Sequence, residues 1–147
     1  MAQTAFRCRL ITPEAVVIDD KAVSAVVPLW DGQMGFLPNR AALVGQLGAG
    51  ELKIDFADTP ERKGGTREFF IDDGFVQMLD NQLTILATLA VDAEKLTEQQ
   101  AQAEVDAAAR QSTEGLSGPA AERVQKQRRR AEAKLRTVRA FRSHSSN

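Results

Sequence analysis

Few residues of this chain are of the types that carry out chemistry. Two carboxylate pairs, Asp19-Asp20 and Asp72-Asp73, could perform acid–base catalysis, but each lies where the sequence predicts a solvated hairpin turn. The only histidine, His144, lies in a Ser-rich tail that we expect to be disordered, and the only cysteine, Cys8, is expected to be buried in a strand. The residues therefore predict no catalytic activity, no metal site and no bound cofactor.

The sequence also contains no phosphate-binding loop motif. The glycines of residues 45–50 are not followed by the Lys-Ser or Lys-Thr pair of a phosphate-binding loop, and we interpret them as turn residues. A basic stretch could neutralise phosphates, and it comprises Arg123, Lys126, Arg128, Arg129 and Arg130. No aromatic residue is interleaved to stack on bases, so we keep an RNA-binding module only as an alternative and expect no nucleic-acid partner.

The segment that precedes the basic stretch is predicted to form β-strands. From residue 6 to about residue 91, apolar residues alternate with polar ones, as in Phe6-Arg7-Cys8-Arg9-Leu10. Residues that favour tight turns separate these runs, among them Gly64-Gly65 and Asp80-Asn81. This spacing predicts an α+β protein that begins with an antiparallel β-sandwich or flattened barrel of about ten short strands.

After residue 91 the sequence becomes rich in alanine and has helical periodicity. Thr97 can cap a first helix, Gln100 can return the hydrogen bond and Leu96 can pack on Ala101. A second helix is predicted to begin at Pro119. Its apolar positions are Val124, Ala131, Leu135 and Val138. Together these signals predict an αα-hairpin.

Large apolar residues divide the chain into two domains. Val, Ile, Leu, Met, Phe and Trp number 32 in residues 5–91 but only 6 in residues 97–141. We therefore predict a self-sufficient sandwich at residues 1–90 and, at residues 91–147, a helical hairpin with a short disordered tail. A helical pair of thin stability depends on what it packs against, which suits it to act as a switch.

Three blocks of the sequence resemble the epsilon subunit of bacterial F-type ATP synthases. Residues 27–43 include Asp31-Gly32-Gln33-Met34-Gly35-Phe36-Leu37-Pro38, which is similar to that family's Asp/Glu-Gly-Glu-Ile/Leu-Gly-Ile-Leu/Tyr-Pro. Residues 47–54 and 69–87 continue the match in the same order, and a helical hairpin of suitable length follows. The resemblance covers residues 6–141.

The resemblance implies a non-catalytic central-stalk subunit of a proton-translocating F-type ATP synthase. Its sandwich would bind the gamma subunit and the c-ring. Its helices, through the basic stretch, would transiently meet the catalytic alpha/beta ring and restrain ATP hydrolysis. The implied rotor contacts are Trp30, Asp31, Gly32, Met34, Gly35, Pro38, Asn39 and Arg40.

The lack of recognisable targeting signals leads us to expect a cytoplasmic location. No run approaches the roughly 20 apolar residues of a membrane-spanning helix, and the start of the chain lacks the apolar core of a secretory signal. We expect a peripheral protein on the cytoplasmic face of the bacterial inner membrane, attached only through the complex.

The sequence departs from the family's pattern at two places with structural consequences. Asn39 and the pair Asp72-Asp73 stand where the family has glycine or serine, and we expect both turns to survive because Asn and Asp tolerate positive φ. Some members bind ATP through Ile/Leu-Asp-x-x-Arg-Ala. Here Thr97 and Gln100 replace the Asp and Arg of that motif, so we expect no tight ATP binding.

Overall fold

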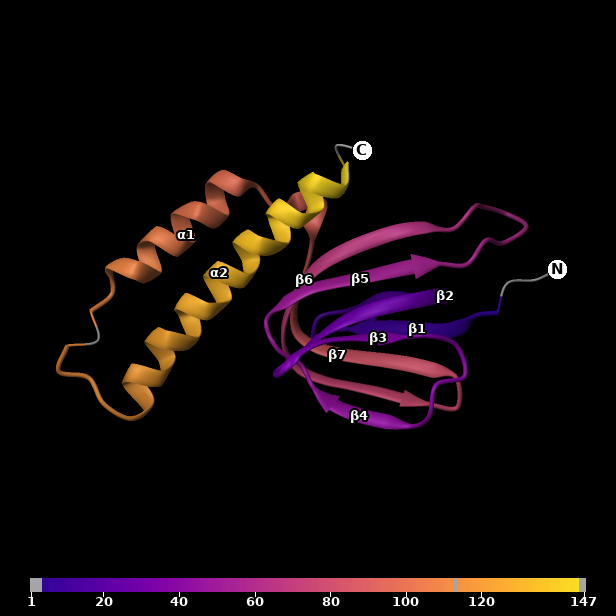
Figure 1. Cartoon of the computed structure of the whole chain (residues 1–147), viewed down its shortest axis with the longest axis horizontal. Coiled ribbons are helices and arrows are strands. Elements are labelled where there is room, and N and C mark those ends of the chain that lie inside the picture. The colour runs from indigo at the N-terminus through magenta and orange to yellow at the C-terminus, as the bar shows by residue number, and fades with distance from the viewer. Residues whose placement is uncertain (1–3, 113, 146–147) are drawn as a thin grey trace.

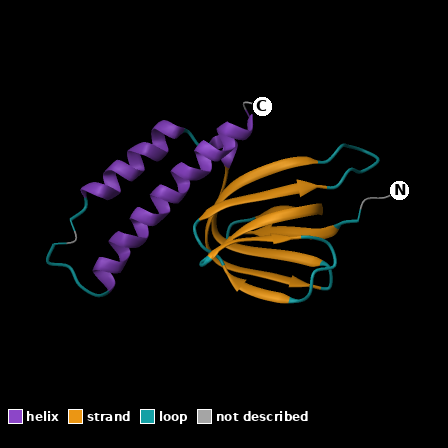
Figure 2. Cartoon of the chain, in the orientation of Figure 1, coloured by secondary structure: helices purple, strands orange, loops and turns teal. Residues whose placement is uncertain are grey.

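The computed structural model describes residues 4–112 and 114–145, where a β-structure is followed by two α-helices (Figure 1, Figure 2). The strands are β1 (Phe6–Ile11), β2 (Val16–Leu29), β3 (Gly32–Phe36), β4 (Leu43–Gln46), β5 (Gly50–Phe56), β6 (Gly65–Leu79) and β7 (Gln82–Asp92). The helical elements are the short η1 (Ala93–Lys95), α1 (Glu98–Arg110) and α2 (Pro119–Ser145).

The strands form a sandwich that closes on itself. They pair in the order β1-β7-β6-β5-β2-β3, and β1 also pairs with β2, so five strands make a ring. β3 lies outside β2, and β4 pairs with β6. These pairings are antiparallel, apart from the parallel pairing of β1 with β7. The predicted fold class, a β-sandwich followed by a helical hairpin, is confirmed.

Long strands serve both layers of the sandwich. β2 pairs with β1 through residues 16–22 and with β5 and β3 through residues 22–29. β6 pairs with β5 through residues 65–71 and with β4 through residues 75–78. The described residues therefore form seven strands rather than about ten, partly because β2 and β6 run on through positions where turns were expected.

The turn predicted at Asp19 and Asp20 is wrong. Both residues lie inside β2, where Asp19 is paired with Arg9 across the ladder. Arg7 donates two hydrogen bonds to the Asp19 carboxylate, at 2.9 and 2.8 Å. Arg7 and Arg9 of the neighbouring strand thus stabilise the Asp19 carboxylate within β2, at a position where the sequence predicted a turn.

The turn predicted at Asp72-Asp73-Gly74 is also wrong, because these residues form a kink inside β6. Asp73 has a φ of 59° and Gly74 a φ of 125°, while the register with β7 stays the same on both sides. The expected positive φ is confirmed at Asp73 and also at Asn39, whose φ is 64°. The kink carries β6 from one layer to the other and points Asp72 toward α2, as described below.

The core lies between the two layers of the sandwich. It is built from alternate positions of the strands, and its largest fully buried side chains include Phe6, Phe36, Phe69, Leu52, Ile54 and Leu83. A two-residue turn at Asp80 and Asn81, both with positive φ, joins β6 to β7 as the sequence predicted. The alternation of apolar and polar residues is thus the main determinant of this part of the fold.

The helices begin where the sequence predicted. Thr97 caps α1, and its hydroxyl accepts a hydrogen bond from the Gln100 N–H at 3.2 Å. Leu96 packs with Ala101 and Leu135 in a small apolar cluster between the helices. α2 begins at Pro119 and continues to Ser145, because no Gly or Pro interrupts it.

The predicted disordered tail is therefore wrong for residues 144 and 145, whose backbone is helical, and residues 146–147 lie outside the described part of the chain.

We expect the sandwich to fold without the hairpin when the chain is cut after Lys95. Val91 and Asp92 still pair with β6, and Ala93 is fully buried, so a cut at residue 90 would remove part of the structure. Circular dichroism of the 1–95 fragment should show a β-sheet spectrum and a cooperative thermal transition. A non-cooperative transition would mean that the core needs the helices.

Candidate interaction surfaces

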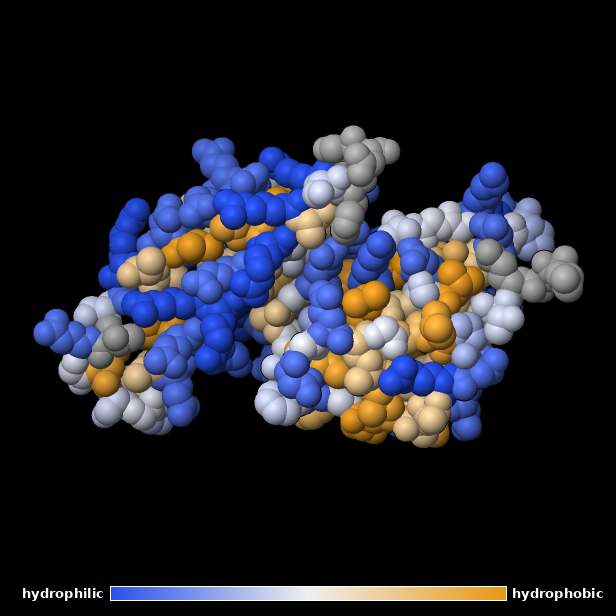
Figure 3. Space-filling view, in the orientation of Figure 1, coloured by the Kyte–Doolittle hydropathy of each residue, from blue (hydrophilic) through white to orange (hydrophobic). Residues whose placement is uncertain are grey.

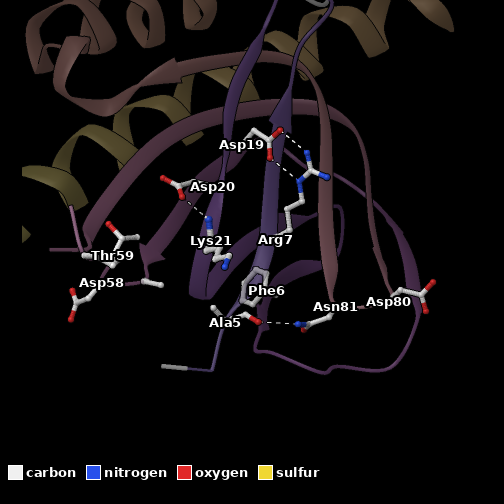
Figure 4. Close-up of a pocket in the computed structure, with 12 residues that line it drawn as sticks. Ala5, Phe6, Arg7, Asp19, Asp20, Lys21, Asp58, Thr59, Asp80 and Asn81 are labelled. Atoms are coloured by element: carbon white, nitrogen blue, oxygen red, sulfur yellow. Dashed lines mark hydrogen bonds and ion pairs between the residues drawn. The ribbon is translucent and has the colours of Figure 1, made fainter. Parts of the chain in front are cut away.

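A pocket at the end of the sandwich away from the helices is lined by acidic residues (Figure 1, Figure 4). Three of its carboxylates are engaged: Arg7 binds Asp19, Arg62 forms an ion pair with Asp20, and Asp58 accepts a backbone hydrogen bond at 2.7 Å. The hydrogen bonds from Arg7 hold the pKa of Asp19 below its usual range. Among the side chains of residues 4–112 and 114–143, no group of three His, Cys, Asp or Glu is placed to hold a metal ion.

The single cysteine is inert. Cys8 is fully buried in β1, as the alternation predicted. Burial, with a smaller contribution from the charge of Asp19, raises the pKa of its thiol to about 12. The reactive thiolate is therefore scarce at neutral pH, and Cys8 serves the core rather than redox or nucleophilic chemistry.

The predicted rotor contacts divide between the two ends of the sandwich. Trp30 and Asp31 form the turn between β2 and β3, at the end that faces α2. Pro38 and Asn39 follow β3 at the opposite end, where the Asn39 N–H donates to the side chain of Asn81 at 2.8 Å. The length of β3 thus places Trp30 and Asp31 at one end of the sandwich and Pro38 and Asn39 at the other.

The remaining rotor candidates belong to β3 or fold back on it. Gly32, Met34 and Gly35 lie in β3. Arg40 returns over the strand, with its guanidinium carbon 5.2 Å from the centre of the Phe36 ring and a hydrogen bond of 3.2 Å to the Gly35 carbonyl. This packing holds the Arg40 guanidinium along the edge strand.

A row of apolar side chains crosses the outer face of one layer, and the sequence interpretation missed it. Phe75 of β6 lies opposite Leu86 of β7, Leu86 opposite Ile11 of β1, and Ile11 opposite Val16 of β2. Phe75 is 59%, Leu86 49% and Val16 54% exposed. We call Phe75, Leu86, Ile11 and Val16 the apolar row. Figure 3 shows apolar side chains gathered over the lower part of the sandwich, whereas the helices present mostly hydrophilic ones.

A sequence signal for the apolar row does exist. In a strand with one solvated face, the neighbour of a buried residue is polar. Here buried Val76 follows exposed Phe75, and buried Ile85 precedes exposed Leu86. Two adjacent apolar residues in an otherwise alternating strand indicate that both faces of the sheet are buried, one by the core and the other by a partner.

Trp30 lies one strand away from the apolar row. The backbone N–H of Trp30 donates to the Gln46 carbonyl at 3.0 Å, and Gln46 is the residue of β4 opposite Phe75. Trp30 is 70% exposed. Trp30 and Phe75 therefore lie on either side of β4, and exposed aromatic side chains are enriched at interface hot spots.

Three cations of the basic stretch are used inside the molecule. Arg130 forms an ion pair with Asp72, and the Lys126 ammonium lies 3.4 Å from the Asp73 carboxylate. Arg128 donates to the carbonyls of Ala108 and Gln111 at the end of α1, the first at 3.2 Å. Arg128 therefore holds the two helices together and complements the helix dipole of α1.

The other two cations point to solvent. Arg123 and Arg129 are exposed, and no carboxylate of the described residues pairs with either. Neither helix in the described part of the chain combines the length and apolar composition needed to cross a bilayer. In this folded-down position, the basic stretch offers two free cations out of five to a partner.

Comparison with known proteins gives consistent matches. Residues 5–93 match the family described as ATP synthase, Delta/Epsilon chain, beta-sandwich domain. An ATP synthase epsilon chain of Thioalkalivibrio sulfidiphilus is 30% identical, with 99% of both chains covered. One from Rhodopirellula baltica is 33% identical, over 65% of this chain and 70% of that relative.

Solved structures share the fold. A chain of the Euglena gracilis mitochondrial ATP synthase superposes with a TM-score of 0.68 at 16% identity, covering 98% of this chain and 83% of that one. A chain of the Tetrahymena thermophila mitochondrial ATP synthase central stalk and c-ring gives a TM-score of 0.60 at 17% identity, covering 96% and 98%. These matches do not support the RNA-binding alternative. The chain belongs to the ATP synthase delta/epsilon chain family.

Proposed function

We propose that this chain is the epsilon-type subunit of an F-type ATP synthase, where it couples the rotor to the catalytic head and has no catalytic activity of its own. The apolar row carries the proposal, because an exposed stripe across four strands has the character of a protein interface. The gamma subunit covers this row together with Trp30. The subunit sits peripherally on the cytoplasmic face of the bacterial inner membrane through its partners.

The rotor candidates at the two ends of the sandwich contact different parts of the rotor. Trp30, Asp31 and Gly32 lie at the turn between β2 and β3, at the end near α2. Pro38, Asn39 and Arg40 lie at the other end. A sandwich held between gamma and the c-ring needs two separate surfaces, and this division supplies them.

The hairpin acts as a brake on ATP hydrolysis. Its basic helix is suited to meet acidic surfaces of the catalytic alpha/beta ring. Thr97 caps α1 by accepting the backbone N–H of Gln100, and we infer that this regulation needs no nucleotide on the chain.

Neutralising the two free cations tests the brake. We expect Arg123→Gln with Arg129→Gln to raise the ATP hydrolysis rate of the assembled enzyme by about two- to fivefold at low salt, since exposed ion pairs contribute about 0–1 kcal/mol each. These two are chosen because their loss leaves the folded-down contacts intact. The increase should shrink as salt rises, because charges are screened over about 8–10 Å at physiological ionic strength.

The matched control neutralises two exposed cations of the sandwich, Lys21→Gln with Lys63→Gln. It changes the net charge equally and should leave the hydrolysis rate unchanged. Equal rates for both double variants would show that the basic helix is not an electrostatic brake.

A further inference from the structure

Two carboxylates on the kink of β6 face the basic helix. Asp72 is 4% exposed, and its carboxylate accepts a hydrogen bond from the Arg130 guanidinium. The carboxylate of Asp73 receives one from Lys126 at 3.4 Å. The left-handed φ of Asp73 and Gly74 allows consecutive residues of one strand to lie against the same helix, where a regular strand would point them to opposite faces.

The ion pairs of Asp72 and Asp73 are only part of the contact between α2 and the sandwich. The α2 residues that face the sandwich across a second cavity are Ala133, Arg136, Thr137 and Ala140. The buried Thr137 hydroxyl donates to the Ala133 carbonyl of its own helix at 2.9 Å. Ala133 and Thr137 are buried but small, so each removes little apolar surface from water, and the ion pairs add to this attachment.

The hairpin itself is held by separate contacts. Lys134 pairs with Glu104 at 3.0 Å, and Glu98 pairs with Arg139 at 3.1 Å and with Arg142 at 3.5 Å. The apolar cluster around Leu135 lies between the same two helices. Breaking the contacts of Asp72 and Asp73 therefore leaves α1 and α2 joined, and the hairpin can leave the sandwich as a unit.

We propose that Asp72 and Asp73 form an acidic latch that holds α2 on the sandwich and withholds Lys126 and Arg130 from the partner that the basic helix meets. Release raises the number of available cations from two to four, so opening of the latch and strength of the brake are coupled. This inference rests on the proposed braking function and names the contact that regulates it. Removing one partner leaves a buried charge uncompensated, which favours the released position.

The test measures the position of the hairpin in the isolated full-length chain. Spin labels on cysteines introduced at Glu14 and Gln125, both exposed, report the distance from the sandwich to α2, and the buried Cys8 does not compete for label. We expect Asp72→Asn to raise the ratio of released to folded-down chains about tenfold, equivalent to about 1.4 kcal/mol. Arg130→Gln should act in the same direction from the other side of the contact.

Two further variants make the outcome decisive. Glu104→Gln removes one carboxylate from an ion pair within the hairpin, and its distance distribution should match that of the unmodified chain. The double variant Asp72→Asn with Arg130→Gln should release no more than the more strongly released single variant, because both substitutions remove one contact. Thermal unfolding of each variant establishes that the sandwich is intact.

An unchanged distance distribution in both Asp72→Asn and Arg130→Gln would overturn the latch. That result would leave the proposed function standing, since the braking role is measured by ATP hydrolysis in the assembled enzyme. If the latch variants release the hairpin but hydrolysis does not respond, the latch holds and the brake is wrong. The two failures are therefore distinguishable.

Discussion

Replacing Phe75 and Leu86 together by aspartate is expected to weaken binding to the gamma subunit by at least about 100-fold. Each large apolar side chain contributes about 1.5–3 kcal/mol when fully buried, and about 1.4 kcal/mol is a factor of ten in affinity. Both residues point outward from the sandwich, opposite each other on β6 and β7. The measurement is the Kd for purified gamma, by calorimetry.

Leu116→Asp provides the matched control for this loss of affinity. Leu116 is an exposed leucine in the loop between the helices, away from the apolar row. The same change of an apolar residue to a carboxylate should leave the Kd within about twofold, since surface substitutions away from an interface change free energies by about 0.5 kcal/mol or less. Equal losses in both variants would remove the apolar row from the interface.

Gly74→Ala is expected to lower the free energy of unfolding by at least about 3 kcal/mol. Gly74 has a φ of 125°, and a Cβ there would stand 1.9 Å from the Leu86 carbonyl oxygen. The neighbouring strand cannot move without breaking its ladder, so the clash is not relieved cheaply. Urea unfolding followed by circular dichroism measures the change.

Gly65→Ala is the control on the same strand. A Cβ at Gly65 meets no atom within 4 Å, and its φ lies outside the left-handed region. Its free energy of unfolding should change by about 0.5 kcal/mol or less. If Gly74→Ala were as mild as this control, the kink would not depend on glycine.

Local signals in the sequence predicted much of the fold. Alternation placed Cys8 and Leu10 in the core, and the turn at Asp80-Asn81 and the cap at Thr97 follow from the chemistry of their own side chains. These features depend on neighbours in the chain. They can therefore be predicted without knowing the tertiary structure.

The features that the sequence did not predict depend on distant residues. Asp72 lies in a strand rather than a turn because β6 crosses between layers, and its cation comes from Arg130 far along the chain. The apolar row exists only once β1, β2, β6 and β7 are in register. For the same reason, the basic stretch could be recognised from its composition, while its division between free and engaged cations could not.

A subunit of the rotor must bind its neighbour in the stalk, so the decisive measurement is whether the purified chain binds the gamma subunit of the same organism. Size-exclusion chromatography of the mixture measures this, with each protein also run alone. We expect the two proteins to co-elute as a one-to-one complex, and we expect the variant with aspartate at positions 75 and 86 not to join it. Separate elution of the unmodified chain and gamma would contradict the assignment of this chain to the rotor.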